Sequence, residues 1–175
     1  MKKYSNIIVT PSTSGISRIK LNEPKTYNAL SLNTLKALIE GFKNFNDDEK
    51  TKVIIIEGTG KGFCAGHNLK EINLLKEKPD YKKLFNLCSE LMMNIVNNNK
   101  PVIAKVHGAA FAAGCQLVAT CDLALSTKDA IFATPGVNIG LFCSTPMVAV
   151  SRNVGRKKTM KMLLTGEPIK AEYAK

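Results

Sequence analysis

Apolar residues recur along this chain with two periods, and the change from one period to the other marks its elements. Residues 6–10 and 15–21 are rich in β-branched side chains with alternating polarity, which predicts two strands joined by a tight turn. Residues 31–45 carry apolar side chains at every third or fourth position, which predicts an amphipathic helix with Ser31 as its N-cap. The continuous apolar run at 52–58 is typical of a strand buried on both faces.

Strand and helix patterns continue to alternate over the rest of the chain. We expect helices at 67–77, 80–98 and 112–120, strands at 101–108, 121–126 and 130–135, and terminal helices broken at Gly155 and around 166–168. No internal repeat or low-complexity linker separates these segments. The pattern therefore predicts one α/β domain over residues 1–175 with largely parallel strands.

The sequence ends within an apparent helix at residues 171–175. An interrupted helical pattern favours a domain truncated at its C-terminus, and a helix that frays at a natural end is the alternative. We therefore expect further helices in a longer form of this protein.

The composition is that of a globular protein with a strongly basic surface. The chain has 25 Lys and Arg against 14 Asp and Glu, a formal net charge of +11. The lysines are spread over helical segments and do not alternate with aromatic residues, so a stacking platform for nucleic acid is missing. We expect no nucleic-acid partner. A solvated basic surface is the simplest explanation, and a small polyanionic ligand would benefit from the same field.

Cysteines, histidines and apolar runs narrow the cellular setting. Five scattered cysteines without a C-x-x-C pair, and two histidines at no zinc-ligand spacing, predict a reducing compartment and no metal site. No apolar run approaches a membrane span, and the N-terminus lacks the features of a signal peptide or presequence. We expect a cytoplasmic location, or the mitochondrial matrix if a presequence lies outside this chain, and no membrane partner.

Two glycine-rich turns, "FCAGHNL" and "AAFAAGCQL", each follow a buried strand and precede a helix. The first turn lies in "GTGKGFCAG", which lacks the glycine spacing of a phosphate-binding loop or a dinucleotide-binding motif. A helix N-terminus leaves N–H groups unpaired, so two such ends meeting at neighbouring strands would place two amides around one oxygen atom, as in an oxyanion hole. A turn-rich surface loop is the simpler interpretation of either segment.

Five blocks of sequence carry a resemblance to a known family. They are "LNEPKTYNALS", "VIIIEGTGKGFCAGHNLKEI", "KPVIAKVHGAAFAAGCQLVATCDLALS", "FATPGVNIGL" and "MLLTGEPIKAEYA". In order and spacing these blocks resemble the crotonase (enoyl-CoA hydratase/isomerase) superfamily over essentially the whole chain. The resemblance implies an α/β fold, a crotonase-type spiral of ββα units whose C-terminal helical trimerisation region is mostly missing. It also implies a homotrimer or hexamer at full length.

The same resemblance implies the ligand and the residues that bind it. The ligand is an acyl-CoA thioester, so coenzyme A enters as part of the substrate and no cofactor is bound permanently. The thioester oxygen lies between the N–H groups of His67 and Ala113, and each such donor is worth about 3–4 kcal/mol in stabilising an enolate. Lys25, Ala65 and Lys70 fall at CoA-binding positions, the two lysines near the phosphates. Solvated surface residues are the alternative for both lysines.

Hydratases of this superfamily activate water with two glutamates, and both positions differ here. Gln116 and Gly136 occupy them, and neither residue can exchange a proton near neutral pH. Because general acid–base help is worth about 10²–10⁴ in rate, we expect ordinary hydratase activity to be weak or absent. His67 together with "AAGCQL" resembles a distinct hydratase-like, "domain-containing" branch that lacks these glutamates.

Other residues are candidates for the missing acid or base. The His67 imidazole has a suitable intrinsic pKa, although a structural role is commoner for such a residue. Asn138, Cys143 and Ser144 lie on the stretch that lines the pocket in relatives, but no base is identifiable beside them. Asp122 stands at a strand start, where a structural role is more natural. Two interpretations therefore stand: an enzyme acting on an acyl-CoA through an enolate, and a non-catalytic acyl-CoA-binding or assembly protein of the same fold.

Overall fold

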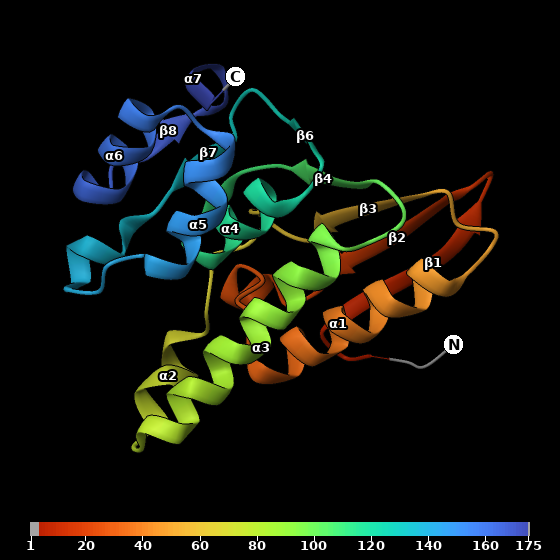
Figure 1. Ribbon diagram of the computed structural model, residues 1–175, viewed down its shortest axis with the longest axis horizontal. Helices are drawn as coiled ribbons and strands as arrows, with labels where there is room; N and C mark the ends of the chain where they lie inside the picture. The colour runs from red at the N-terminus through yellow and green to blue at the C-terminus, as the bar shows by residue number, and fades with distance from the viewer. Residues whose placement is uncertain (1–3, 175) are drawn as a thin grey trace.

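The computed structural model describes residues 4–174, and its larger sheet has five strands (Figure 1). They are β1 (Ile7–Thr13), β2 (Ile16–Leu21), β3 (Val53–Gly58), β4 (Val102–Val106) and β6 (Leu123–Ser126), and their spatial order is β1-β2-β3-β4-β6. β1 and β2 form an antiparallel hairpin, whereas the pairs β2–β3, β3–β4 and β4–β6 are parallel. The carboxyl ends of the four parallel strands therefore meet at one edge of the sheet.

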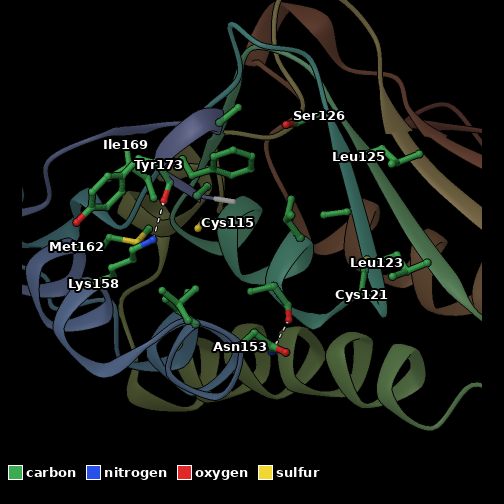
Figure 2. A pocket seen from close by; sticks show the side chains of 18 of the residues that line it. Cys115, Cys121, Leu123, Leu125, Ser126, Asn153, Lys158, Met162, Ile169 and Tyr173 are labelled. Atoms are coloured by element: carbon green, nitrogen blue, oxygen red, sulfur yellow. Dashed lines mark hydrogen bonds between the residues drawn. The ribbon is translucent and has the colours of Figure 1, made fainter.

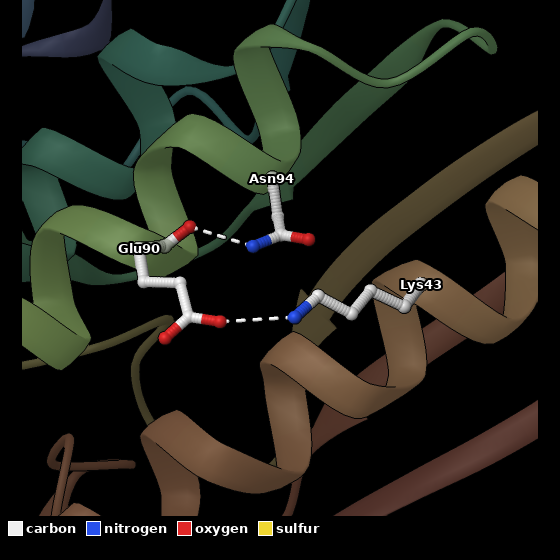
Figure 3. Close-up of polar contacts among 3 residues, drawn as sticks. All are labelled: Lys43, Glu90 and Asn94. Atoms are coloured by element: carbon white, nitrogen blue, oxygen red, sulfur yellow. Dashed lines mark hydrogen bonds and ion pairs between the residues drawn. The ribbon is translucent and has the colours of Figure 1, made fainter.

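Two long helices, α1 (Leu32–Asp47) and α3 (Lys78–Val96), lie side by side against this sheet (Figure 1). Their buried side chains form one hydrophobic core with those of β2, β3 and β4. On the surface, Lys43 Nζ lies 2.9 Å from Glu90 Oε1, and the Asn94 side-chain amide donates to the Glu90 carbonyl at 2.8 Å (Figure 3). An exposed ion pair contributes at most about 1 kcal/mol, so the apolar contacts hold the two helices together.

A smaller sheet and the remaining helices make up most of the rest of the structure. The small sheet has the order β5-β7-β8, with β5 (Ala109–Phe111) parallel to β7 (Ile131–Ala133) and β7 antiparallel to β8 (Ile169–Lys170). The other helices are α2 (Leu69–Leu74), α4 (Ala113–Thr120), α5 (Ser144–Asn153), α6 (Arg156–Thr165) and α7 (Ala171–Ala174), with 3₁₀ turns η1 (Pro24–Thr26) and η2 (Pro135–Ile139). Within residues 4–174, no helix is long and apolar enough to cross a membrane.

The alternating pattern of strands and helices, and the largely parallel pairing, are confirmed, as is the cap of α1. Ser31 accepts a hydrogen bond from the Thr34 N–H at 3.1 Å. The two helices expected at 67–77 and 80–98 are confirmed as α2 and α3, although α2 is shorter than expected and ends at Leu74. β5 and β8 were not predicted: β5 directly follows the strand expected at 101–108, and β8 has only two residues. Pairing with distant segments, rather than local preference, makes them strands.

An apolar groove of about 530 Å³ lies between β6 and the helices that follow it in the chain (Figure 2). β6 is at the edge of the larger sheet, and its side chains Leu123 and Leu125 are 60% and 64% exposed. Across the groove, Lys158 Nζ donates to the Tyr173 carbonyl at 3.1 Å. The groove therefore presents an edge strand and apolar side chains on the surface of the described chain.

Candidate functional site

The two glycine-rich turns lie directly against one another. Cys64 of the first turn forms an isolated parallel bridge with β5, which leads into the second turn. A methyl group placed on Gly66 would lie 3.1 Å from the Ala113 nitrogen, and one on Gly114 would lie 2.1 Å from the Cys64 carbonyl oxygen. Only glycine allows two backbones to approach so closely. Of the two interpretations of these segments, the structure therefore has the one in which the turns converge.

The N–H groups of His67 and Ala113 lie at this contact, and neither has an acceptor among residues 4–174. Leu30 donates to the Gly66 carbonyl at 2.7 Å and accepts from the Asn68 N–H at 3.2 Å. Because Leu30 binds the residues on either side of His67, the His67 N–H points away from Leu30. Ala113 is the first residue of α4, where N–H groups have no partner within the helix. Two unpaired donors at one contact are what an oxyanion hole requires.

The backbone that precedes Ala113 is strained. Ala112, the N-cap of α4, has φ 49° and ψ −118°, and such a conformation costs a residue with a Cβ about 1–3 kcal/mol. Its N–H donates to the Ala133 carbonyl of β7 at 2.9 Å, which holds it in place. Strain of this kind gathers at functional sites. No pattern in the sequence marks it, because alanine ordinarily avoids positive φ.

A cavity of about 300 Å³ opens at the two turns. Ala65 and His67 line it from the first turn and Ala112 and Ala113 from the second, and the remaining walls come from α2, α3, η2 and the start of α5. The walls are mainly apolar, and no Asp, Glu or Lys of the described chain is among the lining residues. An apolar chamber with a few backbone donors is typical of a small-molecule site.

The His67 imidazole is enclosed by protein. Its ring stands edge-on to Phe85 with the centroids 5.6 Å apart, and neither ring nitrogen has a hydrogen-bond partner within the described residues. Burial lowers the pKa of His67, and the nearby Leu30 backbone opposes this shift only in part. The imidazole is therefore neutral at pH 7. This environment fits a packed side chain, and proton transfer by His67 stays a hypothesis.

Gln116 does not line the cavity. The residue is 5% exposed, and its Oε1 accepts a weak hydrogen bond from Cys88 Sγ of α3 at 3.9 Å. Its side-chain amide therefore lies in the contact between α4 and α3, where a neutral group is accommodated more easily than a carboxylate.

Gly136 lines the cavity from η2, but the backbone around it leaves no room for a side chain. A Cβ at this position would lie 2.0 Å from the Leu141 carbonyl oxygen and 2.8 Å from Cys143 Sγ. The Leu141 N–H donates to the Gly136 carbonyl at 2.9 Å and closes the loop. Neither position at which the resemblance expects a glutamate therefore supplies a proton-exchanging group to the cavity.

Of the other residues that the sequence suggested as an acid or base, three line the cavity and one has a structural role. Asn138, Cys143 and Ser144 line the cavity. Burial raises the pKa of the Cys143 thiol, although the Gly136 backbone opposes this, so the sulfur is protonated and a poor nucleophile. Asp122 has the structural role expected, since its Oδ2 accepts from the Val102 N–H at 2.7 Å.

Two of the three predicted CoA-binding residues lie outside the cavity. Lys25 in η1 and Lys70 in α2 are exposed and do not line it, whereas Ala65 does. Contacts of the two lysines with CoA phosphates therefore stay a prediction. Among residues 4–174, no three His, Cys, Asp or Glu side chains gather as a metal site would require.

Asn28 is the site residue that sequence analysis missed. Its buried side chain bonds to three carbonyl groups of the loop that leads into the first turn. The available signal was a polar residue inside the block "LNEPKTYNALS". Its partners, however, are more than 30 positions away in the chain, so local pattern does not reveal them.

Comparison with known proteins places this site in a family. The sequence profile of the enoyl-CoA hydratase/isomerase family matches residues 12–175. The chain is 49% identical over 170 residues to the mitochondrial enoyl-CoA hydratase domain-containing protein 3 of Danio rerio. The matched region covers 97% of this chain and 59% of that protein. The chain thus spans little more than half the length of this relative.

Solved structures agree. An enoyl-CoA hydratase from Mycobacterium smegmatis superposes with a TM-score of 0.95 at 48% identity, covering 98% of this chain and 66% of that one. Human enoyl-CoA hydratase domain-containing protein 3 gives a TM-score of 0.93 at 47% identity, covering 97% and 66%. The crotonase fold is thereby confirmed, over about two thirds of the solved chains. This chain therefore belongs to the enoyl-CoA hydratase/isomerase family of the crotonase superfamily, in the branch of the hydratase domain-containing proteins.

Proposed function

We propose that this protein binds an acyl-CoA thioester in the 300 Å³ cavity and holds its carbonyl oxygen between the N–H groups of His67 and Ala113. The observation that carries the proposal is the contact between the two glycine-rich turns, which leaves both amides without an acceptor in the described chain. Family membership supports a CoA thioester as the ligand. Coenzyme A enters with the substrate, and no cofactor is held permanently.

The chemistry that fits this site is stabilisation of an enolate. When the carbon next to the thioester carbonyl gains or loses a proton, negative charge gathers on the carbonyl oxygen. Two fixed amide donors favour that charge, each by about 3–4 kcal/mol, and the apolar walls strengthen the effect by excluding water. Backbone donors are independent of the side chain, so Ala113 serves as well as glycine would.

Hydration of an enoyl-CoA is expected to be weak or absent. Water must be activated by an acid or a base, and no carboxylate of the described residues lines the cavity. Gln116 packs against α3, and Gly136 has no space for a side chain. The same observations favour a second candidate, a non-catalytic acyl-CoA-binding or assembly protein that keeps the two amides for binding alone.

Three further parts of the proposal come from the family. Lys25 and Lys70 bind the CoA phosphates, because both are exposed cations on elements next to the first turn. The protein assembles as a homotrimer or hexamer at full length, and the exposed leucines of β6 support burial of that surface. It acts in the cytoplasm or in mitochondria; the second is the compartment that the name of its Danio rerio relative gives for that protein.

The experiment that tests the proposal combines binding and turnover. Calorimetry with crotonyl-CoA, a panel of other acyl-CoA esters and free CoA measures affinity, while absorbance and chromatography follow conversion. We expect binding of esters and little hydration of crotonyl-CoA. Hydration at the rate of a competent hydratase would refute the expected weakness of that activity, and failure to bind any CoA ester would refute the function as a whole. Ester binding without any turnover would favour the non-catalytic candidate.

A further inference from the structure

Residues 27–30, here called the anchoring segment, hold the turn that carries the first amide donor. The Tyr27 carbonyl accepts from the Ala65 N–H at 2.9 Å. The Leu30 N–H donates to the Gly66 carbonyl at 2.7 Å, and the Leu30 carbonyl accepts from the Asn68 N–H at 3.2 Å. Three main-chain hydrogen bonds from the anchoring segment therefore fix the turn on both sides of the donor.

The Asn28 side chain adds a second set of bonds, to the loop that enters this turn. Its Nδ2 donates to the carbonyls of Thr59 at 2.8 Å, Gly62 at 2.9 Å and Phe63 at 3.1 Å. Its Oδ1 accepts from the Glu23 N–H at 2.9 Å, and the residue is 1% exposed. The two Nδ2 hydrogens are shared among the three carbonyls, and Oδ1 also accepts from Thr59 Oγ1 at 3.5 Å, a combination that a primary amide provides in one small side chain. No other side chain of the described residues bonds to more of this loop.

The backbone of the anchoring segment is itself in an uncommon conformation. Tyr27 has φ 52° and Asn28 has φ 57°, so two consecutive residues with side chains lie in the left-handed region. Asparagine tolerates this region better than most residues, whereas tyrosine does not. Such conformations persist where surrounding contacts determine them, and they gather at functional sites. The segment is therefore held in the one shape that presents Asn28 to the loop.

We propose that Asn28 is a positioning residue for the oxyanion hole: its side chain fixes the loop at 59–63 so that the His67 N–H is held toward the thioester carbonyl. The assignment rests on the proposed function, because it assumes that this N–H binds a thioester oxygen. Asn28 does not line the cavity, so it acts through the backbone that it holds. A displacement of about 1 Å in a catalytic group can lower a rate roughly 100-fold, so a loosened loop is enough to disable the donor.

Two substitutions separate the parts of this role. Asn28→Asp keeps the size of the side chain and its acceptor oxygen but removes the donor to the three carbonyls. Asn28→Gly keeps the left-handed backbone and removes the side chain. The matched control is Asn6→Asp, because Asn6 is 6% exposed and its Nδ2 donates to Thr34 Oγ1 at 3.0 Å, outside the turn. Loss of stability alone would affect all three variants.

The readout is the carbonyl stretching band of crotonyl-CoA labelled with ¹³C at the thioester carbon, recorded by isotope-edited infrared difference spectroscopy on the bound ester. In the wild-type protein and in Asn6→Asp, we expect the band to move to lower frequency on binding. In the two Asn28 variants, we expect at most half of that shift, because the His67 N–H is then no longer held toward the carbonyl. Circular dichroism establishes whether each variant is folded. If Asn28→Asp does not fold, the shift measured on Asn28→Gly tests the role of Asn28.

A full wild-type shift in a folded Asn28 variant overturns the assignment. A comparable loss of shift in Asn6→Asp also overturns it, because general destabilisation would then be the cause. A wild-type protein that binds crotonyl-CoA with an unshifted band, or does not bind it, overturns the proposed function first and this assignment with it.

Discussion

Gly114→Ala perturbs the contact between the two glycine-rich turns with a single methyl group. The new Cβ would lie 2.1 Å from the carbonyl oxygen of Cys64 and 2.8 Å from its carbonyl carbon. Both atoms belong to the backbone, so no side-chain rotation relieves the overlap. The turns must instead separate by about 1 Å, and overpacking of this kind costs about 1–3 kcal/mol or more.

A second glycine in a helix provides the control. A Cβ on Gly41 of α1 would lie 3.3 Å from Ile19 Cδ1, the free end of a flexible side chain. Alanine is favoured over glycine within helices by about 1 kcal/mol, a gain that both variants share. We therefore expect the free energy of unfolding of Gly41→Ala to lie within about 1 kcal/mol of the wild-type value. For Gly114→Ala we expect it to be lower by about 2 kcal/mol.

Urea denaturation followed by circular dichroism measures both free energies of unfolding, and calorimetry with crotonyl-CoA measures binding. Because the Ala113 donor moves with the turn, Gly114→Ala should also weaken the binding of crotonyl-CoA more than that of free CoA. Gly41→Ala should change the affinity for neither ligand. Equal stability and equal ester binding in the two variants would refute the reasoning, since the turns would then have room that the structure does not give them.

Three other outcomes can be checked independently. Gly136→Glu, alone or with Gln116→Glu, should destabilise the fold and should not restore crotonyl-CoA hydration, because the Leu141 carbonyl occupies the space; hydration by a folded variant would contradict this. The lowered pKa of His67 means that the unfolded state binds more protons below about pH 6.5, so the free energy of unfolding should fall as pH drops from 7 to 5, by at most about 1.4 kcal/mol per pH unit. His67→Gln should reduce that slope in urea titrations, and an unchanged slope would contradict burial of the neutral ring. Burial raises the thiol pKa to about 12 in Cys64, Cys88 and Cys115, so these three thiols should not react with Ellman's reagent at pH 8 until urea is added. Rapid reaction of more than two of the five thiols of the native protein would contradict their burial.

The parts of the fold that depend on local periodicity could be predicted from the sequence. The helical spacing over residues 31–45 and the apolar run at 52–58 correspond to α1 and β3, since both elements bury whole faces in the core. The pattern alone left the meeting of the two glycine-rich turns open beside a simpler surface loop, and the resemblance to the crotonase superfamily favoured it. Periodicity failed for β5 and β8, whose pairing partners are distant in the chain.

The finer structure of the site depends on contacts between segments far apart in the sequence. Asn28 bonds to carbonyls 31 to 35 residues away, so its role is set by tertiary structure. The space at Gly136 is closed by the Leu141 carbonyl, which the missing glutamate alone does not reveal. The orientation of Gln116 toward α3 likewise follows from helix packing. In each case residue identity was informative, but the neighbours that give it meaning come from the fold.

The binding of a thioester carbonyl between two backbone amides can be observed in a single spectrum. Crotonyl-CoA with ¹³C at the thioester carbon is bound to the wild-type protein, and its carbonyl band is compared with that of the free ester in buffer. If the N–H groups of His67 and Ala113 both bind the oxygen, the C=O bond is polarised and the band lies at lower frequency in the complex. A band at the frequency of the free ester, from a sample in which calorimetry has established saturation, would contradict the two-amide site.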